Sequence, residues 1–243
     1  MPRNIEIFMK LSIVIPVYNE SKTIKEVLKK IGSVDLGDIE KEIVIVDDFS
    51  IDGTREILKE LEGLEKFKIH FHEKNMGKGA AIRSGFKLGK GDIFLIQDAD
   101  LEYDPQDYNT LLKPILDGKA DVVFGSRFIG NQAHRVFYNT HYLANKFLTF
   151  FSNLLTGLNI SDMETCYKVF NKEAVQKILP HLVSNRFGIE PELTAKVAKH
   201  KLRVFEVGIS YSGRTYEEGK HINWKDGLAA IWHIVHFNLF SRK

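Results

Sequence analysis

Short apolar runs alternate with segments of helical periodicity through the first half of the chain. The runs are rich in β-branched residues and predict buried strands at residues 11–17, 43–46, 67–71, 93–96 and 122–124. Apolar residues at helical spacing predict helices over residues 20–31, around 57–61 and over 77–88. Apolar strands separated by amphipathic helices are typical of a mostly parallel sheet with helices on both faces. The pattern therefore predicts an α/β fold.

The second half has a less regular pattern. It predicts an aromatic-rich helix at 142–155, a strand at 165–170, a helix at 191–200, an extended segment at 202–211, a polar loop at 213–220 and a last helix at 224–240. We see no internal repeat, low-complexity tract or interdomain linker. We therefore expect one domain over residues 1–221, followed by an amphipathic helix at 222–243.

Composition narrows the class of protein without defining it. A chain of 243 residues with 44% hydrophobic and 27% charged residues suits one soluble globular domain. The net charge of +2 gives no indication of nucleic-acid binding. The single cysteine, Cys166, excludes an internal disulfide and suits a reducing compartment. No apolar run approaches the roughly 18 residues of a spanning helix, and no signal peptide is visible, so we expect a cytoplasmic protein.

Polar and acidic residues follow three of the predicted strands. They are Tyr18, Asn19 and Glu20 after the first strand, Asp47 and Asp48 after the second, and Asp98 and Asp100 after the fourth. In open α/β sheets, ligands bind beyond the carboxyl ends of the strands. We therefore expect these side chains to form one site.

The triplet Asp98-Ala99-Asp100 is the most informative of these segments. Two carboxylates separated by one residue at a strand exit can both turn toward one hard cation. Mg²⁺ or Mn²⁺ held there would bridge the carboxylates to the phosphates of a nucleotide. The alternative is a solvated acidic turn without a ligand.

Four segments in order resemble the family 2 glycosyltransferases of GT-A fold. They are residues 14–20 (VIPVYNE), 44–54 (VIVDDFSIDGT), 75–79 (NMGKG) and 98–100 (DAD). The resemblance, which covers about residues 11–130, implies a nucleotide-sugar half of a catalytic domain, with an acceptor half at about 131–221. It implies a nucleotide-sugar site formed by Pro16, Tyr18, Glu20, Asp48, Gly77, Lys78, Gly79, Asp98 and Ala99, and a metal held by Asp98 and Asp100.

Elementary chemistry agrees with these implied roles. A carboxylate such as that of Asp48 can accept a hydrogen bond from the N–H of a pyrimidine or guanine edge. The Gly77-Lys78-Gly79 segment at a helix start offers backbone N–H groups, a positive dipole end and an ammonium to phosphate. The alternative for both glycines is an ordinary turn into a helix.

The second half resembles the subgroup that glycosylates polyprenyl or dolichyl phosphates, as dolichol-phosphate mannosyltransferases do. The matching segments are residues 125–128 (GSRF), 154–157 (LLTG), 162–168 (DMETCYK), 187–192 (FGIEPE) and 213–220 (GRTYEEGK). Cys166 stands where the subgroup usually has glycine. The last segment resembles a mobile loop that closes over the donor, in which Arg214 and Lys220 would neutralise the diphosphate; otherwise these are solvated charges.

Three residues are candidates for the acceptor side of the site. Arg127 and Arg135 are expected to bind the acceptor phosphate, because a guanidinium can bind phosphate through two parallel hydrogen bonds. Asp162 is a candidate general base or a partner of another site residue, and a helix cap is equally compatible with its position. With Asp100, Arg127 and Asp162 form the predicted catalytic set.

The last predicted helix has two interpretations. Its sequence is too short and too polar to span a membrane. It either lies in a membrane interface, with Arg242 and Lys243 meeting anionic headgroups, or packs on the domain or on a protein partner. We therefore expect a protein that is cytoplasmic or peripheral at the cytoplasmic membrane face.

The residues and the resemblance together predict a metal-dependent transfer of a hexose from a UDP- or GDP-sugar to a polyprenyl or dolichyl phosphate, and the resemblance implies inversion at the anomeric carbon. A phosphate acceptor needs no general base, because its second pKa of about 6 leaves it largely dianionic at neutral pH. Two alternatives stay open: transfer to a saccharide or protein hydroxyl, and a non-catalytic nucleotide-sugar-binding subunit of a membrane partner. No nucleic-acid partner is expected.

Overall fold

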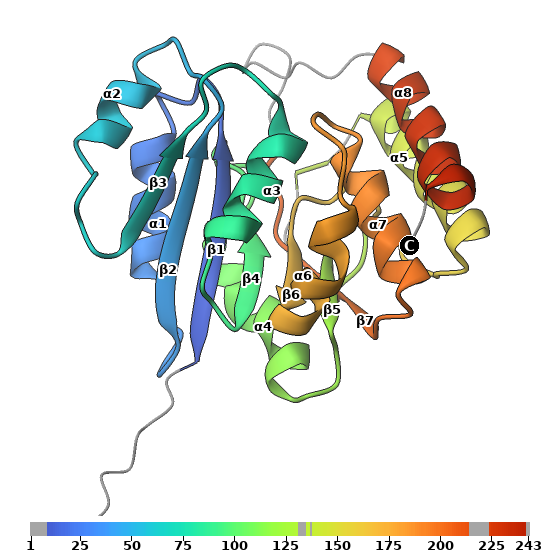
Figure 1. Ribbon diagram of the computed structural model, residues 1–243. Coiled ribbons are helices and arrows are strands. Elements are labelled where there is room, and N and C mark those ends of the chain that lie inside the picture. Colours follow the sequence, from blue (N-terminus) through green and yellow to red (C-terminus); the bar gives the residue numbers. More distant parts are fainter. Residues whose placement is uncertain (1–8, 131–134, 137, 214–223, 242–243) are drawn as a thin grey trace, which may run out of the picture.

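The fold is a single twisted sheet of seven strands, seen in a computed structural model that describes residues 9–130, 135–136, 138–213 and 224–241 (Figure 1). The strands are β1 (Lys10–Val17), β2 (Glu40–Asp47), β3 (Phe67–Phe71), β4 (Ile93–Ile96), β5 (Val122–Ser126), β6 (Lys168–Asn171) and β7 (Val204–Gly208). Their order is β3-β2-β1-β4-β6-β5-β7. Only β6 runs antiparallel to its neighbours, β4 and β5. The predicted α/β class is confirmed.

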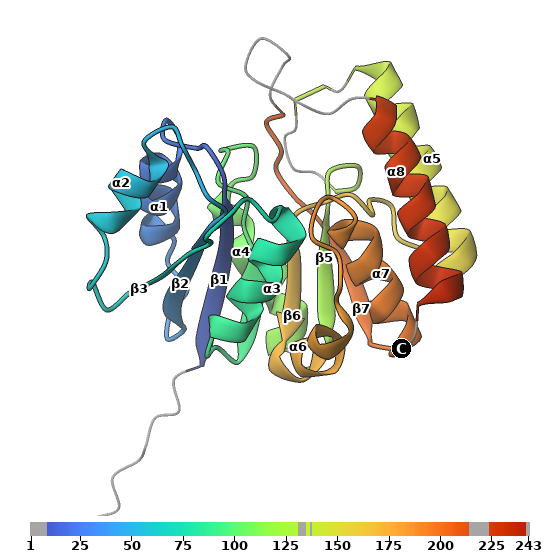
Figure 2. The same cartoon turned by 45° about the horizontal axis from the view of Figure 1, so that its top comes forward.

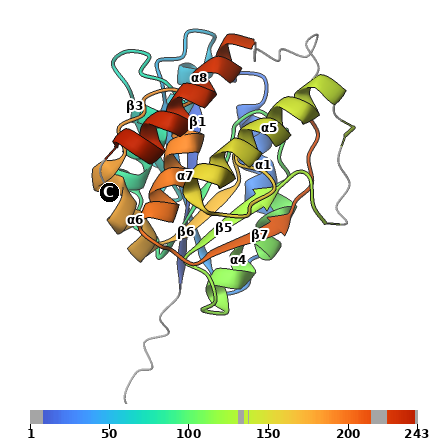
Figure 3. The same ribbon diagram turned by 90° about the vertical axis from the view of Figure 1, so that its right-hand side faces the viewer.

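Helices cover both faces of the sheet. They are α1 (Ile24–Ser33), α2 (Thr54–Lys59), α3 (Lys78–Leu88), α4 (Tyr108–Leu116), α5 (Asn139–Thr156), α6 (Lys172–Ile178), α7 (Ile189–Lys199) and α8 (Trp224–Val235), which continues as a π-helical turn, His236–Phe240. The helices α5 and α8 lie side by side beyond α7 (Figure 2). Seen along the sheet, α1 and α4 lie on one side and α6 and α7 on the other (Figure 3).

The strand predictions hold, whereas several boundaries differ for local reasons. The first helix begins at Ile24 and not at residue 20, because residues 20–23 form a turn in which Thr23 N–H donates to the Glu20 carbonyl. The strand β6 begins at Lys168 and not at 165, since the carbonyls of Met163 and Thr165 turn toward the Lys168 ammonium. The helices α4 and α6 were not predicted.

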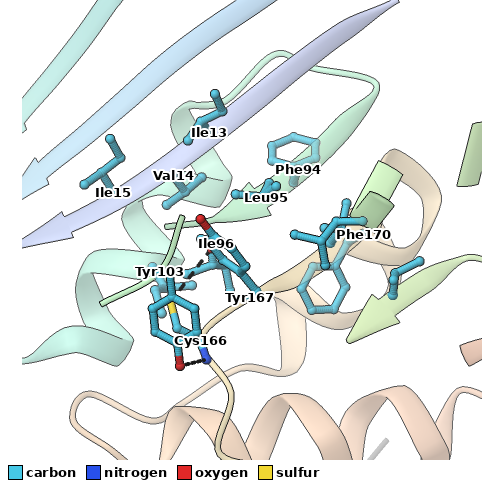
Figure 4. Close-up of a cluster of buried hydrophobic side chains, with 14 of the residues drawn as sticks. Ile13, Val14, Ile15, Phe94, Leu95, Ile96, Tyr103, Cys166, Tyr167 and Phe170 are labelled. Carbon is cyan, nitrogen blue, oxygen red and sulfur yellow. Dashed lines mark hydrogen bonds between the residues drawn. The ribbon is translucent and has the colours of Figure 1, made fainter. Parts of the chain in front are cut away.

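The core beneath the carboxyl edge of β4 is aromatic and hydrogen-bonded (Figure 4). The hydroxyls of Tyr108 and Tyr167 both donate to Gln97 Oε1, at 2.7 and 2.8 Å. The Tyr103 hydroxyl accepts the Cys166 N–H at 3.0 Å. Because buried polar groups cost stability unless paired, these bonds fix the loops that leave β4 and enter β6.

The last helix packs on the domain through one side. Ile234 and Phe237 are buried, and α8 contacts both α5 and α7. This is one of the two predicted interpretations, although the opposite side of the same helix stays exposed at Leu228 and Trp232. No helix in the part of the chain that the structure describes is long and apolar enough to cross a membrane.

Candidate active site

The loops after β1 and β2 are joined into one wall at the carboxyl edge of the sheet. Asn19 N–H donates to Ser50 Oγ at 2.9 Å, and Glu20 N–H donates to Thr54 Oγ1 at 3.0 Å. The wall presents the predicted residues Tyr18, whose side chain is exposed, and Glu20, whose Oε2 accepts from the Thr23 hydroxyl at 2.7 Å. Pro16 lies in β1 opposite Val46 of β2 and completes the wall.

Backbone strain marks the same edge. Asn19, Phe49 and Leu101 have φ values of 56°, 68° and 65°, which side chains with a Cβ rarely adopt. They lie in the loops after β1, β2 and β4. Such conformations persist only where the surroundings enforce them, and only one other described non-glycine residue, Lys201, has a positive φ; the placement of these three supports a functional role for the loops.

Asp48 is buried and organises the loop before α3. Its Oδ1 accepts the Met76 N–H at 2.8 Å and lies 2.7 Å from His72 Nδ1, while its Oδ2 accepts the Gly77 N–H at 2.6 Å. His72 Nε2 in turn lies 3.0 Å from Ser84 Oγ on α3. The sequence predicted Asp48 but missed His72, whose only signal is its position directly after β3.

The two glycines of the 75–79 segment permit a close backbone contact. Gly77 has φ +97°, and a Cβ there would lie 2.5 Å from the Asn185 carbonyl oxygen. A Cβ on Gly79 would lie 2.5 Å from the Ser184 carbonyl oxygen. Residues 184–186 therefore cross the start of α3, which gives both glycines a structural reason besides the predicted contact with a nucleotide.

Lys78 joins the two halves of the site. Its Nζ lies 2.8 Å from Asp98 Oδ1 and 3.3 Å from Glu190 Oε1 in the first turn of α7. Burial disfavours the charged form of this lysine, but the neighbouring Asp98 and Glu190 carboxylates outweigh burial and raise its pKa well above the ordinary value. The side chain is therefore an ammonium.

Asp98 and Asp100 follow β4 and are both partly exposed, while Ala99 between them is buried. Asp100 Oδ1 accepts the Glu102 N–H at 3.1 Å. Among the described residues, no group of three or more His, Cys, Asp or Glu side chains is arranged for a metal ion. Mg²⁺ usually keeps several waters and uses one or two protein carboxylates together with substrate phosphates. The oxygen donors of this pair fit such a cation.

Arg127 and Asp162, both predicted for the acceptor side of the site, form a buried ion pair. Arg127 Nε lies 2.7 Å from Asp162 Oδ2, and Nη2 lies 2.7 Å from Oδ1. Burial lowers the pKa of Arg127, but Asp162 more than compensates and the pKa is raised. Asp162 thus takes the position of a partner, one of the roles predicted for it.

Both candidate phosphate-binding arginines contact the segment 211–213. The Arg127 guanidinium carbon lies 5.2 Å from the centroid of the Tyr211 ring. Arg135 N–H donates to the Tyr211 carbonyl at 2.8 Å, and its Nη1 donates to the Gly213 carbonyl at 3.0 Å. The structure therefore brings Arg127 and Arg135 to one segment, whereas Arg214 and Lys220 lie outside the described residues.

A second buried charged group, not predicted from the sequence, lies between the two halves. Because β6 runs antiparallel to β4, its first residue, Lys168, reaches the carboxyl end of β4. Its Nζ lies 2.5 Å from Glu190 Oε2, and the lysine side chain is fully buried. Nearby Glu164 has a buried Oε1 with no hydrogen-bond partner among the described residues. Burial, and secondly Glu190, raise the pKa of Glu164 to about 7.

We expect Glu164→Gln to make the protein more stable than the wild type at pH 8. The unfolded carboxyl loses its proton near 4.5, whereas the folded one keeps it up to about 7. Wild-type stability therefore falls as pH rises from 4.5 to 7, by about 3 kcal/mol from this group, and stays lower above pH 7. Urea unfolding of both proteins at pH 5 and pH 8 measures the difference. An equal pH dependence in the two proteins would contradict this assignment.

Fold and site together define a glycosyltransferase of GT-A architecture, an open α/β sheet with an acidic pair in the loop after β4. Residues 12–179 match the family described as Glycosyl transferase family 2. The chain belongs to this family and is a glycosyltransferase.

Several relatives match most of the chain. An uncharacterized protein of Methanocaldococcus jannaschii is 30% identical over 95% of this chain and 93% of its own length. A dolichol-phosphate mannosyltransferase of Pyrococcus furiosus is 30% identical over 88% of this chain, which spans 61% of that protein. A UDP-N-acetylglucosamine–dolichyl-phosphate N-acetylglucosaminyltransferase of Methanococcus voltae is 29% identical over 92% of this chain and 94% of its own length.

Solved structures share the fold at lower identity. Glucosyl-3-phosphoglycerate synthase of Mycobacterium tuberculosis, in complex with Mn²⁺, UDP and glucosyl-3-phosphoglycerate, has a TM-score of 0.71 and 19% identity over 95% of this chain and 80% of that one. The same enzyme with Mg²⁺ and UDP gives a TM-score of 0.69, with 19% identity over 95% and 79% of the chains. These structures support the GT-A fold.

Proposed function

We propose that this glycosyltransferase moves a hexose from a UDP- or GDP-sugar to a polyprenyl or dolichyl phosphate, with inversion and with Mg²⁺ or Mn²⁺. The observation that carries the proposal is an exposed apolar face beside the acceptor side of the site. The names of the Pyrococcus and Methanococcus relatives, which specify dolichyl phosphate, support the same acceptor.

The donor lies along the wall formed by Pro16, Tyr18, Glu20 and Asp48. Residues 77–79 face the nucleotide, with Lys78 supplying positive charge, and Asp98 and Asp100 hold the cation. A bound divalent cation supplies the positive charge that stabilises the departing diphosphate.

The acceptor phosphate meets the donor from the Arg127 side. One phosphate oxygen attacks the anomeric carbon, the bond from that carbon to the diphosphate oxygen breaks, and its electron pair leaves with the diphosphate. No proton has to be removed from a phosphate dianion. Arg127 and Arg135 bind the acceptor phosphate, and Asp162 holds the Arg127 guanidinium in orientation.

The apolar face consists of exposed apolar side chains on α5 and α8, two helices that lie side by side (Figure 2). Its residues, each more than half exposed, are Leu143, Phe147, Phe150 and Leu154 of α5 and Leu228, Trp232, Leu239 and Phe240 of α8 and its π-helical turn. Large aromatic side chains together with an uncharged helix face are typical of segments that lie in a membrane interface. α5 carries Lys146 and no acidic residue, which suits an anionic lipid surface.

The apolar face is connected to the site through the start of α5. Arg127 Nη2 lies 3.4 Å from Asn145 Oδ1, and the Phe128 ring packs on Tyr142 with centroids 5.4 Å apart. A lipid phosphate with its chain in a bilayer against this face therefore has its headgroup near Arg127. This arrangement favours a membrane-embedded acceptor over a soluble one.

A second candidate function is transfer to a hydroxyl group. Such an acceptor needs a general base with a pKa near the working pH. Glu164, with its pKa of about 7 and an unpartnered oxygen close to Glu190, is the observation that favours it.

The test is transfer from labelled UDP- and GDP-hexoses to two acceptors: a long polyprenyl phosphate in anionic vesicles and a short one in detergent. We expect Phe150→Ser/Trp232→Ser to lose about tenfold or more of the activity on vesicles, because two exposed aromatic side chains that would insert into the bilayer are lost. Activity on the short acceptor should stay within about twofold of the wild type, as the site is unchanged.

Leu64→Ser/Leu116→Ser is the matched control, since both leucines are exposed but lie away from the apolar face. Equal loss in both double variants would contradict a membrane role for this face. Transfer to saccharide hydroxyls, with none to either polyprenyl phosphate, would favour the second candidate.

A further inference from the structure

The Lys78 ammonium is bonded to the Asp98 carboxylate, which is a proposed ligand of the cation. Its Nζ lies 2.8 Å from Asp98 Oδ1 and 3.1 Å from Oδ2, so it bonds both oxygens of this side chain. Asp98 and Asp100 are the proposed ligands of the divalent cation. An ammonium and a divalent cation cannot share one carboxylate at this distance without strong repulsion. Lys78 therefore competes with the cation for Asp98.

Glu190 offers the Lys78 ammonium a second carboxylate. Glu190 Oε1 lies 3.3 Å from Lys78 Nζ, yet it has no hydrogen bond within the described part of the chain. Glu190 cannot follow the lysine, because Lys168 holds its other oxygen at 2.5 Å. Lys168 is itself fixed by the carbonyls of Met163 and Thr165. A small rotation of the Lys78 side chain can thus release Asp98 while the ammonium keeps and shortens its contact with Glu190.

The start of α3 places the released ammonium beside the donor. Lys78 is the first residue of this helix, where backbone N–H groups favour phosphate. The preceding loop is held rigidly by Asp48, through hydrogen bonds from Met76 and Gly77. The backbone at residue 78 therefore stays in place while its side chain changes partner.

We propose that Lys78 couples cation binding to donor binding. Its ammonium holds Asp98 in the free protein and moves to Glu190 and the donor diphosphate when a divalent cation occupies Asp98 and Asp100. The inference rests on the cation use of the proposed function. It implies that the cation binds weakly alone and much more tightly together with a nucleoside diphosphate, since the diphosphate gives the displaced ammonium a new partner.

The test is titration with Mn²⁺, followed by the electron paramagnetic resonance of the free ion, with and without UDP or GDP. A neighbouring positive charge changes the proton affinity of an aspartate by one to three pKa units. Removing the Lys78 ammonium should change the Mn²⁺ affinity of Asp98 by at least as large a factor. We expect Lys78→Met to bind Mn²⁺ about tenfold more tightly than the wild type without nucleotide. The added effect of the nucleotide should shrink in this variant.

Two further variants make the result specific. Lys87→Met changes an exposed lysine of the same helix and should behave as the wild type. Glu190→Gln removes the alternative anion, so its Mn²⁺ affinity without nucleotide should fall, opposite to the effect of Lys78→Met. Thermal unfolding verifies that each variant is folded, and Glu190→Gln tests the inference if Lys78→Met is not.

Unchanged or weaker Mn²⁺ binding by folded Lys78→Met, or unchanged binding by Glu190→Gln, overturns the inference. If the wild type and Lys87→Met bind no Mn²⁺ even with UDP or GDP, the proposed use of a cation is wrong. The inference about Lys78 is then wrong as well, because it rests on that use.

Discussion

Asp100→Ala lowers sugar transfer by about a hundredfold to a thousandfold, the loss typical of removing one stabilising group at a developing charge. The side chain is partly exposed and lies in a loop after β4, so the substitution removes a half-exposed hydrogen bond from the Glu102 N–H together with the proposed contact with the cation. The free energy of unfolding should therefore stay close to that of the wild type. Initial rates of transfer and urea unfolding measure the two quantities.

Asp38→Ala is the matched control for this variant. Asp38 is an exposed aspartate before β2, at the opposite edge of the sheet. Removing divalent cations with a chelator should lower wild-type activity to the level of Asp100→Ala and leave that variant unaffected. Near-normal turnover by Asp100→Ala in a buffer with Mg²⁺ or Mn²⁺ would refute the assignment of a cation to this pair.

Arg127→Ala lowers the free energy of unfolding by about 3 to 5 kcal/mol, because it leaves the buried Asp162 carboxylate without its cation. The sequence predicts for Arg127 a role in binding the acceptor phosphate, and it does not predict this effect on stability. The double variant Arg127→Ala/Asp162→Ala should recover part of the stability, since it leaves no unpaired charge. Urea unfolding of the single and double variants measures the coupling.

The ion pair between Arg203 and Asp121 provides the comparison, as it is similar in length but has an exposed arginine. Arg203→Ala should lower the free energy of unfolding far less than Arg127→Ala does, because water screens the exposed pair. If Arg127→Ala costs no more than Arg203→Ala, Arg127 is not held as the structure indicates. If the folded double variant binds donor normally but fails to use polyprenyl phosphate, Arg127 has the predicted acceptor role as well.

The sheet could be predicted because its strands are buried on both faces. The apolar composition of runs such as residues 11–17 and 43–46 is enough to predict strands there. Parallel strands then place the loops that follow them at one edge of the sheet. That reasoning placed Asp48, Asp98 and Asp100 at one edge, whereas Lys78 was assigned to the site through the family resemblance. The roles assigned to these residues stay predictions, since the bound donor and cation are what would test them.

The charged pairs could not be predicted, because they depend on the position of β6. Asp162 is 35 residues from Arg127, and Glu190 is 22 residues from Lys168. Neither spacing suggests a contact until β6 is placed antiparallel between β4 and β5. A weaker signal existed: Lys168 directly precedes the apolar residues Val169 and Phe170, and a lysine entering a buried strand needs a buried partner.

The reversed strand β6 also dictates the order in which the molecule can assemble. Strands β1 to β4 come from residues 10–96 and pair with one another, so this part of the sheet can form early in synthesis. In the sheet, β5 pairs with β6 and β7, which both follow it in the chain. Until residue 168 is made, β4 and β5 each present open hydrogen-bonding edges rich in valine, isoleucine and phenylalanine. Such edges favour aggregation. A nascent chain that ends before residue 168 therefore stays prone to aggregation until the four-residue strand β6 is made and covers both edges.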